Sequence, residues 1–450
     1  MMTACTRPRR SVPYCGDSNR ALRRHERITL MRLTMPFGRG SLSADLPAGC
    51  TAEVIRPRTQ PPAADPAALV RDAVYSPLGA VRPPRAGQTV AIAINDKTRP
   101  VPHEHLLPPV LQGMRHAGVR DEDVTFIIAT GTHPGMTPDE YDAILPREII
   151  ATYRVLCHDG GDETNLTRLG ETARGTPVWI NSVYLAADYR IVIGNIEPHQ
   201  FQGFSGGVKS AAIGLAGAST INHNHAMMRH EGARLGEYDA NPARLDVEEI
   251  GRMIGIDFAV NAILNSDKQI VKAFAGDPAA VMRAGIPAAR ALCQIPVAEP
   301  FDLMIASPGG HPKDINIYQS QKGMAHAALI TRSGGRLILC AACPEGSGNA
   351  DYERWMADAR IRSHADVFER FERDGFRVGR HKAWQVSRDA ARIHTSLVSG
   401  LDAEFARGLL FEPQPGLQSA IDAALAALPA GARIGVMPAA NATIPVLGST

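Results

Sequence analysis

Three stretches decide the fold of this chain: TVAIAIN (89–95), VTFIIAT (124–130) and DYRIVIGNI (188–196). Each is a short, nearly unbroken apolar run bounded by turn-forming residues, which is typical of a strand buried on both faces. YRVLCHD (153–159) adds a further strand, and a helix is predicted over 103–117. Strands that alternate with helices predict a mainly parallel sheet, so this part of the chain is expected to be α/β.

A second α/β series begins near residue 301, where DLMIAS (302–307) and RLILCA (336–341) flank a predicted helix over 316–330. We therefore expect an α/β protein with two domains, each built on a mainly parallel sheet. The predicted parts are a leader (1–30), an N-terminal cofactor-binding domain (31–297), a C-terminal domain (298–432) and a final strand in 433–450 that could pack on either domain. The charged stretch 351–375 is expected to be a helix with a solvated face.

The composition of the 450 residues is that of a globular protein, with 44% hydrophobic and 21% charged residues. It excludes collagen-like and disordered classes, and no apolar run approaches the ~18 residues that a membrane span needs. The net charge of +2 comes from seven arginines in residues 1–30, so the rest of the chain is net acidic. Because no basic patch is expected in the folded body, we predict neither a nucleic-acid nor a membrane partner.

The leader has no apolar segment of the kind found in secretory signals. We expect one of two cases: either Met31 is the true start and residues 1–30 are not part of the native protein, or residues 1–30 are disordered. Seven cysteines at irregular spacing argue against a disulfide framework and favour the reducing cytoplasm.

Polar side chains follow the ends of four predicted strands. Loops at the carboxyl ends of parallel strands are where α/β proteins bind their ligands, so these positions are candidates for a site. They are Asp96, Lys97, Thr98 and Arg99 after the first strand, His133 after the second, His199 after 188–196, and Gln319 and Lys322 beyond 302–307. These residues also have structural explanations: Asp96 and Arg99 could form a turn ion pair, and Gln319 and Lys322 could be the solvated face of a helix. A lone histidine after a strand, such as His133 or His199, could be a cap or a buried hydrogen-bonding group.

The glycine-rich block GFSGGVKS (203–210) allows close backbone approach to a ligand and ends near Lys209. It resembles a phosphate-binding P-loop, but Val208 stands where that motif needs glycine. A nucleotide-phosphate cradle is therefore possible, whereas an ordinary NTPase is not expected. His223 and His225 follow, and one or two imidazoles suit a transition metal such as nickel. The Cys340–Cys343 pair favours buried thiols over zinc, since a lone CxxC supplies only two ligands.

Six blocks together resemble the lactate racemase family. The resemblance runs from about Met31 to near the C-terminus, with the blocks in the family's order. They are NDKTRP (95–100), GTHPGMT (131–137), HDGGDET (158–164), PHQFQGFSGGVK (198–209), NHNH (222–225) and DINIYQSQK (314–322). We expect the active site in the cleft between the two domains.

The family uses a nickel-pincer nucleotide, a pyridinium mononucleotide that holds nickel through one carbon and two sulfurs. The resemblance implies that Lys209 carries this cofactor covalently and that His225 is a nickel ligand. It also implies that His133 and His199 are the two acid–base residues. The segment Asp96, Lys97, Thr98 and Arg99 would contact the cofactor, and Arg99, Tyr318, Gln319, Lys322 and Trp384 would bind substrate.

The function that follows is a 2-hydroxyacid racemase or epimerase, with lactate as the default substrate. Removing the C2 hydrogen as hydride gives a flat 2-keto acid that can be reduced from either face, and the hydride acceptor must be a cofactor. Two histidines can handle the hydroxyl proton because their ordinary pKa lies near neutrality. The resemblance also implies cofactor-maturation enzymes as partners. Two alternatives stay open: a non-catalytic nucleotide or cofactor-binding protein, and a metal-dependent hydrolase using His223 and His225.

Overall fold

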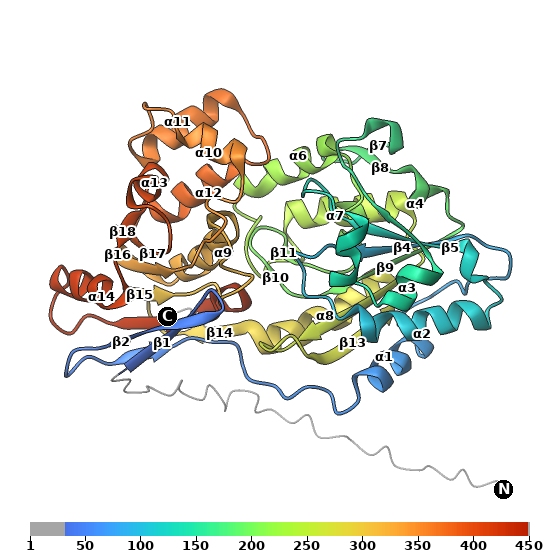
Figure 1. Cartoon of the computed structure of the whole chain (residues 1–450), viewed down its shortest axis with the longest axis horizontal. Coiled ribbons are helices and arrows are strands. Elements are labelled where there is room, and N and C mark those ends of the chain that lie inside the picture. The colour runs from blue at the N-terminus through green and yellow to red at the C-terminus, as the bar shows by residue number, and fades with distance from the viewer. Residues whose placement is uncertain (1–31, 449–450) are drawn as a thin grey trace, which may run out of the picture.

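The structure, a computed structural model, describes residues 32–448, so the predicted leader 1–30 lies outside the described residues. Two α/β units lie side by side, each built on a six-stranded sheet (Figure 1). This arrangement confirms the expected fold class. None of the helices in the described part of the chain is long and apolar enough to cross a membrane.

The first sheet has the order β13-β12-β9-β4-β5-β6. Its neighbours are parallel except β12 and β13, which pair antiparallel. The strands are β4 (Val90–Asn95), β5 (Val124–Ala129), β6 (Arg154–Cys157), β9 (Tyr189–Asn195), β12 (Phe258–Leu264) and β13 (Ile270–Gly276). The predicted strands at 89–95, 124–130, 153–159 and 188–196 are therefore confirmed.

Helices on both faces bury this sheet, which explains why its strands are apolar throughout. In β4, Ile92 and Ile94 pack into one core cluster while Ala91 and Ala93 pack into another, because successive side chains of a strand point to opposite faces. The helices of this unit are α1 (Pro66–Tyr75), α2 (His103–His116), α3 (Arg147–Thr152), α4 (Ser182–Ala186), α5 (Lys209–Ala212), α6 (Ala218–Ala226), α7 (Pro242–Ile254) and α8 (Pro278–Cys293). Two short hairpins add β7 (Leu166–Glu171) to β8 (Pro177–Asn181) and β10 (Pro198–His199) to β11 (Gly203–Phe204).

The second sheet is parallel throughout, with the order β18-β17-β16-β15-β19-β3. Its strands are β3 (Ala52–Val54), β15 (Phe301–Ala306), β16 (Thr331–Cys340), β17 (His394–Val398), β18 (Glu412–Gln414) and β19 (Ile434–Met437). Its helices are α9 (Ile317–Ala328), α10 (Ala350–Met356), α11 (His364–Asp374), α12 (His381–Ala390), α13 (Ala403–Gly408) and α14 (Leu417–Ala426).

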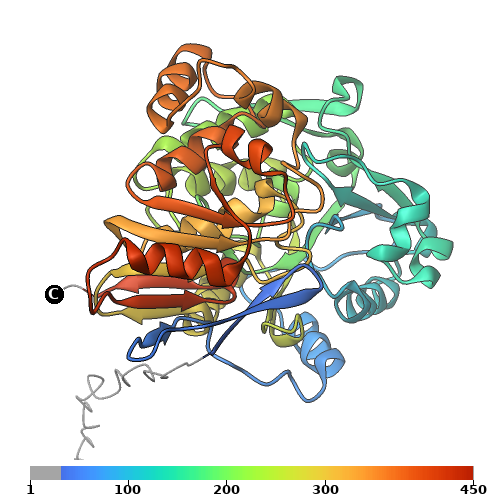
Figure 2. The ribbon, with the colours of Figure 1, turned by 60° about the vertical axis from the view of Figure 1, so that its left-hand side comes forward.

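The first strands of the described chain belong to this second unit, which corrects the expectation that they are part of the N-terminal domain. β3 pairs with β19, and the hairpin of β1 (Arg32–Phe37) and β2 (Gly40–Asp45) buries Leu33 and Met35 in the same core as α14. Figure 2 shows these blue strands against the red end of the chain. The pairing gives β19 a second neighbour, so β19 is an inner strand of the sheet.

The C-terminal segment, left unassigned by the sequence, joins the second sheet through β19. A further strand, β20 (Ile444–Leu447), follows it and pairs with β14 (Gln294–Val297), the strand that leads from the first unit into the second. The segment 433–450, expected to hold one final strand, therefore holds two, β19 and β20.

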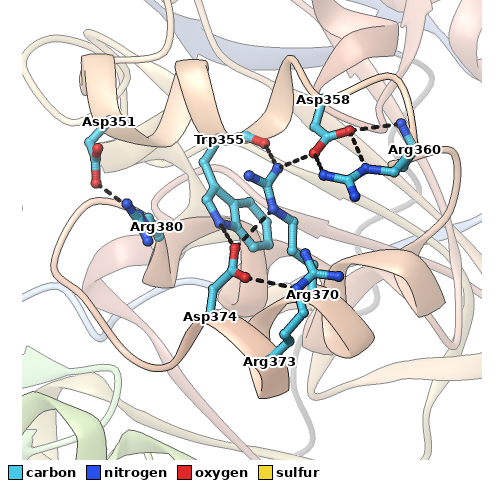
Figure 3. A network of polar contacts seen from close by, with 8 residues as sticks. All are labelled: Asp351, Trp355, Asp358, Arg360, Arg370, Arg373, Asp374 and Arg380. Carbon is cyan, nitrogen blue, oxygen red and sulfur yellow. Dashed lines mark hydrogen bonds and ion pairs between the residues drawn. The ribbon is translucent and has the colours of Figure 1, made fainter.

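The charged stretch 351–375 forms two helices, α10 and α11, rather than one. Ser363 caps the start of α11, and Asp358 bonds the backbone and side chain of Arg360 in the turn between the helices. Arg370 of α11 stacks its guanidinium 4.5 Å from the Trp355 ring centroid and pairs with Asp374 (Figure 3). Much of the charge expected to face solvent therefore holds these two helices together.

We predict that Gly251→Ala destabilises the protein. A Cβ at Gly251 in α7 would lie 2.5 Å from Cβ of Val208, the residue that precedes Lys209. Overpacking of this kind costs about 1–3 kcal/mol. Gly113→Ala in α2 is the matched control, because it meets nothing within 4 Å and should stabilise its helix by about 0.5–1 kcal/mol. Thermal unfolding of both variants tests this; equal melting temperatures would contradict the predicted clash.

Candidate active site

The site lies where loops from both sheets meet. In the first sheet, β5 and β6 lie on one side of β4, and the later strands β9, β12 and β13 lie on its other side. The strand order therefore reverses next to β4, and α/β proteins bind ligands at such a switch point. The loops after β4, β5 and β9 line a pocket there, and α9 and α12 of the second unit form its opposite wall. The pocket wall includes Asp96, Arg99, His133, Glu197, His199, Lys209, His225, Tyr318, Lys322, His381 and Lys382.

Asp96 and His133 form a hydrogen-bonded pair at the ends of β4 and β5. His133 Nδ1 lies 2.7 Å from Asp96 Oδ2, while Oδ1 of the same carboxylate accepts bonds from the backbone N–H and the hydroxyl group of Thr98. Burial would raise the pKa of Asp96, but the hydrogen bond and charge of His133 and the charge of Arg99 outweigh it and lower this pKa to about 2. An ionised Asp96 places the neutral ring's proton on Nδ1, so Nε2 of His133 is left as a proton acceptor.

His199 has the opposite hydrogen-bonding polarity. Its Nδ1 accepts a bond from the backbone N–H of Gln202 at 3.2 Å, so the proton of the neutral ring lies on Nε2. Burial, followed by the charges of Lys209 and Arg99, holds the pKa of His199 well below its ordinary value. The pocket therefore contains one imidazole with an open acceptor nitrogen, on His133, and one that offers an N–H hydrogen-bond donor, on His199.

The glycine-rich loop before Lys209 is held by a buried arginine. Arg244 of α7 donates to the carbonyl oxygens of Phe204 and Gly206, each at 3.0 Å, and forms an ion pair with Glu248 at 2.6 Å. Gly203 has a φ of +70°, and a Cβ there would overlap the backbone of residue 237. This path of the loop therefore requires glycine at 203, and α5 begins just beyond the loop with Lys209.

The amine of Lys209 has a lowered pKa, as a lysine nucleophile requires. Burial, then the charges of Arg99 and Arg244, lower the pKa of its amine to about 7. A large part of this amine is therefore unprotonated at neutral pH, and an unprotonated lysine can attack an activated carbonyl group.

His225 of α6 presents a nitrogen that has no protein partner. Its Nδ1 is buried and makes no well-formed hydrogen bond within residues 32–448, although the backbone of Ile221, one turn earlier, lies close enough to affect the pKa of the ring. Burial, then the charges of Lys209 and His133, lower the pKa of His225 to about 3, which keeps the ring neutral as a metal ligand must be. The Phe201 ring lies between the rings of His199 and His225, 4.8 and 5.0 Å from them.

The far wall of the pocket suits a carboxylate. Lys322 and Tyr318 lie one turn apart on α9, and Nζ of Lys322 donates to Oε1 of Gln319 at 2.6 Å. This bond leaves the remaining ammonium protons of Lys322 free to bind an anion.

Comparison with known proteins agrees with this geometry. Residues 37–236 match the lactate racemase N-terminal domain and residues 297–444 the lactate racemase C-terminal domain. A lactate racemase from Thermoanaerobacterium thermosaccharolyticum is 30% identical over 338 residues, which cover 74% of this chain and 79% of that protein. One from Lactiplantibacillus plantarum is 32% identical over 276 residues, which cover 61% of this chain and 65% of that protein.

The chain belongs to the lactate racemase family.

Solved structures of similar proteins share the fold of this chain. The lactate racemase apoprotein from Thermoanaerobacterium thermosaccharolyticum superposes with a TM-score of 0.85 at 28% identity, covering 92% of this chain and all of that chain. A Thermotoga maritima protein with a TM-score of 0.63 is 16% identical, over 85% of this chain and 97% of that one, and shares the fold. The expectation of an isomerase of the lactate racemase family is confirmed.

Not all residues expected at the site line the pocket. Lys97 is exposed and pairs with Glu140, and Thr98 bonds Asp96 instead of facing the cavity. Gln319 contacts Lys322 but is not part of the pocket wall. Trp384 packs against Phe371 and lines grooves beside the pocket.

His223 points away from His225. It is exposed, and its Nε2 lies 3.2 Å from the carbonyl oxygen of Arg174. Within residues 32–448, no group of three or more His, Cys, Asp or Glu side chains is placed to hold a metal ion. A hydrolase that relies on protein ligands alone is therefore not supported. Cys340 and Cys343 are buried, as expected of structural thiols.

Sequence reasoning missed His381 and Lys382, which line the pocket from α12. They precede Trp384 in the same motif, GRHKAWQ (379–385), and the helical period turns 381 and 382 to the pocket and 384 away from it. Glu197 follows β9 and also lines the pocket. Burial would raise the pKa of Glu197, but the charges of Lys313 and Arg99 outweigh it and lower this pKa.

We predict that Lys209 reacts with an amine-specific ester at lower pH than surface lysines do. Its labelling rate in the unloaded full chain should reach half of its maximum near pH 7, because this is where the amine loses its proton. Labelling of ordinary exposed lysines rises beyond pH 9. Peptide mapping by mass spectrometry measures both, and a Lys209 profile that follows the surface lysines would contradict the buried, cation-flanked environment.

Proposed function

We propose that the protein racemises a 2-hydroxy acid, with hydride transfer at C2 and two histidines that handle the hydroxyl proton. The observation that carries this proposal is the pair His133 and His199, which line one pocket with opposite hydrogen-bonding polarity. Lactate is the substrate in the names of the relatives, and it is the first candidate here.

The residues fit the nickel-pincer nucleotide that the family resemblance implies. Lys209 offers an amine with a pKa of about 7, and His225 offers a buried nitrogen without a protein partner. We propose that Lys209 holds the nucleotide covalently, that His225 binds its nickel, and that Asp96 and Arg99 contact it. When bound, this group supplies a hydride acceptor that no amino-acid side chain can replace. Loading then requires cofactor-maturation enzymes as partners.

His133 is the base for the hydroxyl proton of one enantiomer. Its Nε2 accepts the proton, and the ionised Asp96 stabilises the imidazolium that forms. The flat keto acid forms when the hydroxyl proton is removed while the hydrogen on C2 leaves as hydride. Lys322 holds the carboxylate while the keto group turns to its other face.

His199 returns a proton to the reformed hydroxyl group. In the unloaded chain the charge of Lys209 is the strongest charge effect that lowers the pKa of His199. An acylated lysine is neutral and a bound substrate carboxylate is negative, so occupancy of the pocket raises the pKa of His199 toward its ordinary value. When Nδ1 gives up the bond from Gln202 and takes a second proton, the imidazolium can serve as acid for one enantiomer, and the neutral ring it leaves can serve as base for the other.

We predict that His133→Ala and His199→Ala each lower racemisation by 10²- to 10⁴-fold, the usual contribution of a positioned acid or base. The exposed His116 serves as the matched control, and His116→Ala should keep wild-type turnover. Chiral chromatography of lactate and larger 2-hydroxy acids measures the rates in loaded protein. Near-normal turnover in both pocket variants would exclude the two-histidine scheme.

We predict that Lys209→Ala abolishes the covalent adduct and that His225→Ala lowers the nickel content. His223→Ala, two residues before His225 on α6 and exposed, should keep both. Intact mass and metal analysis of protein produced with the maturation enzymes provide the readout. An unchanged adduct in Lys209→Ala would eliminate this lysine as the attachment point. Bare protein without adduct or nickel, from a host that loads a known relative, would contradict the cofactor assignment.

A further inference from the structure

Lys382 carries a buried amino group that lines the pocket without a carboxylate partner. The residue is 1% exposed, and its Nζ donates to Oε1 of Gln321 at 3.1 Å and lies 4.3 Å from the ring centroid of Tyr318. Both of these partners are neutral. Among the described residues, no carboxylate lies within ion-pair distance of Lys382.

The nearest acidic side chain is already neutralised. Asp389 accepts two bonds from Arg388, at 2.7 and 2.9 Å, and a third from the amide of Gln321. Asp389 therefore reaches Lys382 only through Gln321. Burial, then the charge of Arg388, lower the pKa of Lys382 to about 7, as expected of an ammonium that lacks a direct counter-ion.

The position of Lys382 in its helix adds to this charge imbalance. His381 and Lys382 are the first two residues of α12, where the helix dipole is positive and cations are unfavourable. His381 Nδ1 accepts a bond from the backbone N–H of Gly379, so its neutral ring carries the proton on Nε2. Both side chains thus offer donors to the pocket from the positive end of a helix, an arrangement that favours an anion.

Lys382 is also placed to reach a substrate held by Lys322. Tyr318 and Lys322 are four residues apart on α9 and share one face of this helix, and Lys382 lies over the Tyr318 ring. Lys322 and Lys382 both line the pocket, and the charge of Lys382 is among the causes that lower the pKa of Lys322, so the two amino groups face the same space. Neither amino group forms an ion pair with a carboxylate among the described residues, although the charge of Glu197 acts on Lys322 from the same pocket wall. Burying an unpaired charge is costly.

We propose that Lys382, assisted by His381, binds a second carboxylate of the substrate, so that the protein acts on 2-hydroxy dicarboxylic acids in preference to lactate. This inference rests on the proposed racemase function, whose carboxylate and hydroxyl contacts it leaves unchanged. A phosphate group of the bound nucleotide shares the same anionic chemistry, and the experiment below separates the two sources.

The test compares malate with lactate as substrates of loaded wild-type protein and of Lys382→Met. We expect kcat/KM for malate to exceed that for lactate at least tenfold in the wild type. Lys382→Met should lower the malate value at least tenfold and the lactate value less than threefold, with adduct mass and nickel content unchanged. Lys272→Met, a substitution of the same kind on the exposed face of β13, should change neither.

Two results would overturn the inference. Equal losses for malate and lactate would show that Lys382 has no role in selecting the second carboxylate. Loss of the adduct or of nickel in Lys382→Met would show that the cofactor's phosphate, not the substrate, is the anion at this position.

A binding measurement separates this inference from the racemase proposal itself. Succinate and propionate differ by one carboxylate and lack the hydroxyl group, so neither can react. Calorimetry on the loaded full chain should show succinate binding at least tenfold more tightly than propionate, and Lys382→Met should remove this difference. If the preference is present but no 2-hydroxy acid is racemised, the racemase proposal fails and the second anion site stands. If racemisation occurs without the preference, the second-carboxylate inference fails alone.

Discussion

Mutual repulsion among buried cations is the constraint on which the pocket depends. Arg99, Lys209, Lys322 and Lys382 line one cavity, and Asp96 and Glu197 are the carboxylates on its wall. After burial, the charge of Arg99 is the next cause that lowers the pKa of both Lys209 and Lys322. Burial and the charge of Lys209 also lower the pKa of His199 and His225. An unoccupied pocket of this kind is electrostatically unfavourable, and anionic ligands relieve the repulsion.

The fold supplies the rigidity that such crowding requires. Each sheet is buried on both faces, and the polar loops leave the carboxyl ends of its inner strands. Arg244 fixes the glycine-rich loop by binding its carbonyl groups and pairs with Glu248, so its own charge is balanced. Asp96 is held by Thr98 and in turn orients His133. Reactive groups in the pocket are thus positioned by contacts made outside it.

The sequence predicts the strands and the site residues that the first unit contributes, because both depend on local patterns. Continuous apolar runs identify β4, β5 and β9, and the residues after them reach the pocket because parallel strands end at one edge. The placement of β3 depends instead on pairing with β19, which lies far along the chain, and no local pattern encodes this contact. Lys382 was missed for a similar reason: which face of α12 meets the pocket is decided by the packing of the second unit.

In the proposed chemistry the hydrogen on C2 and the proton of the hydroxyl group go to different acceptors. His133 and His199 handle only the hydroxyl proton, and the C2 hydrogen leaves as hydride. The most direct test is the fate of deuterium at C2 when one enantiomer of a C2-deuterated 2-hydroxy acid, lactate or malate, is racemised in ordinary water by the loaded protein. Mass spectrometry of the separated enantiomers measures it. The account predicts that the product enantiomer retains its deuterium. Replacement of the deuterium by solvent hydrogen would show that a histidine removes a proton from carbon, and would contradict the account.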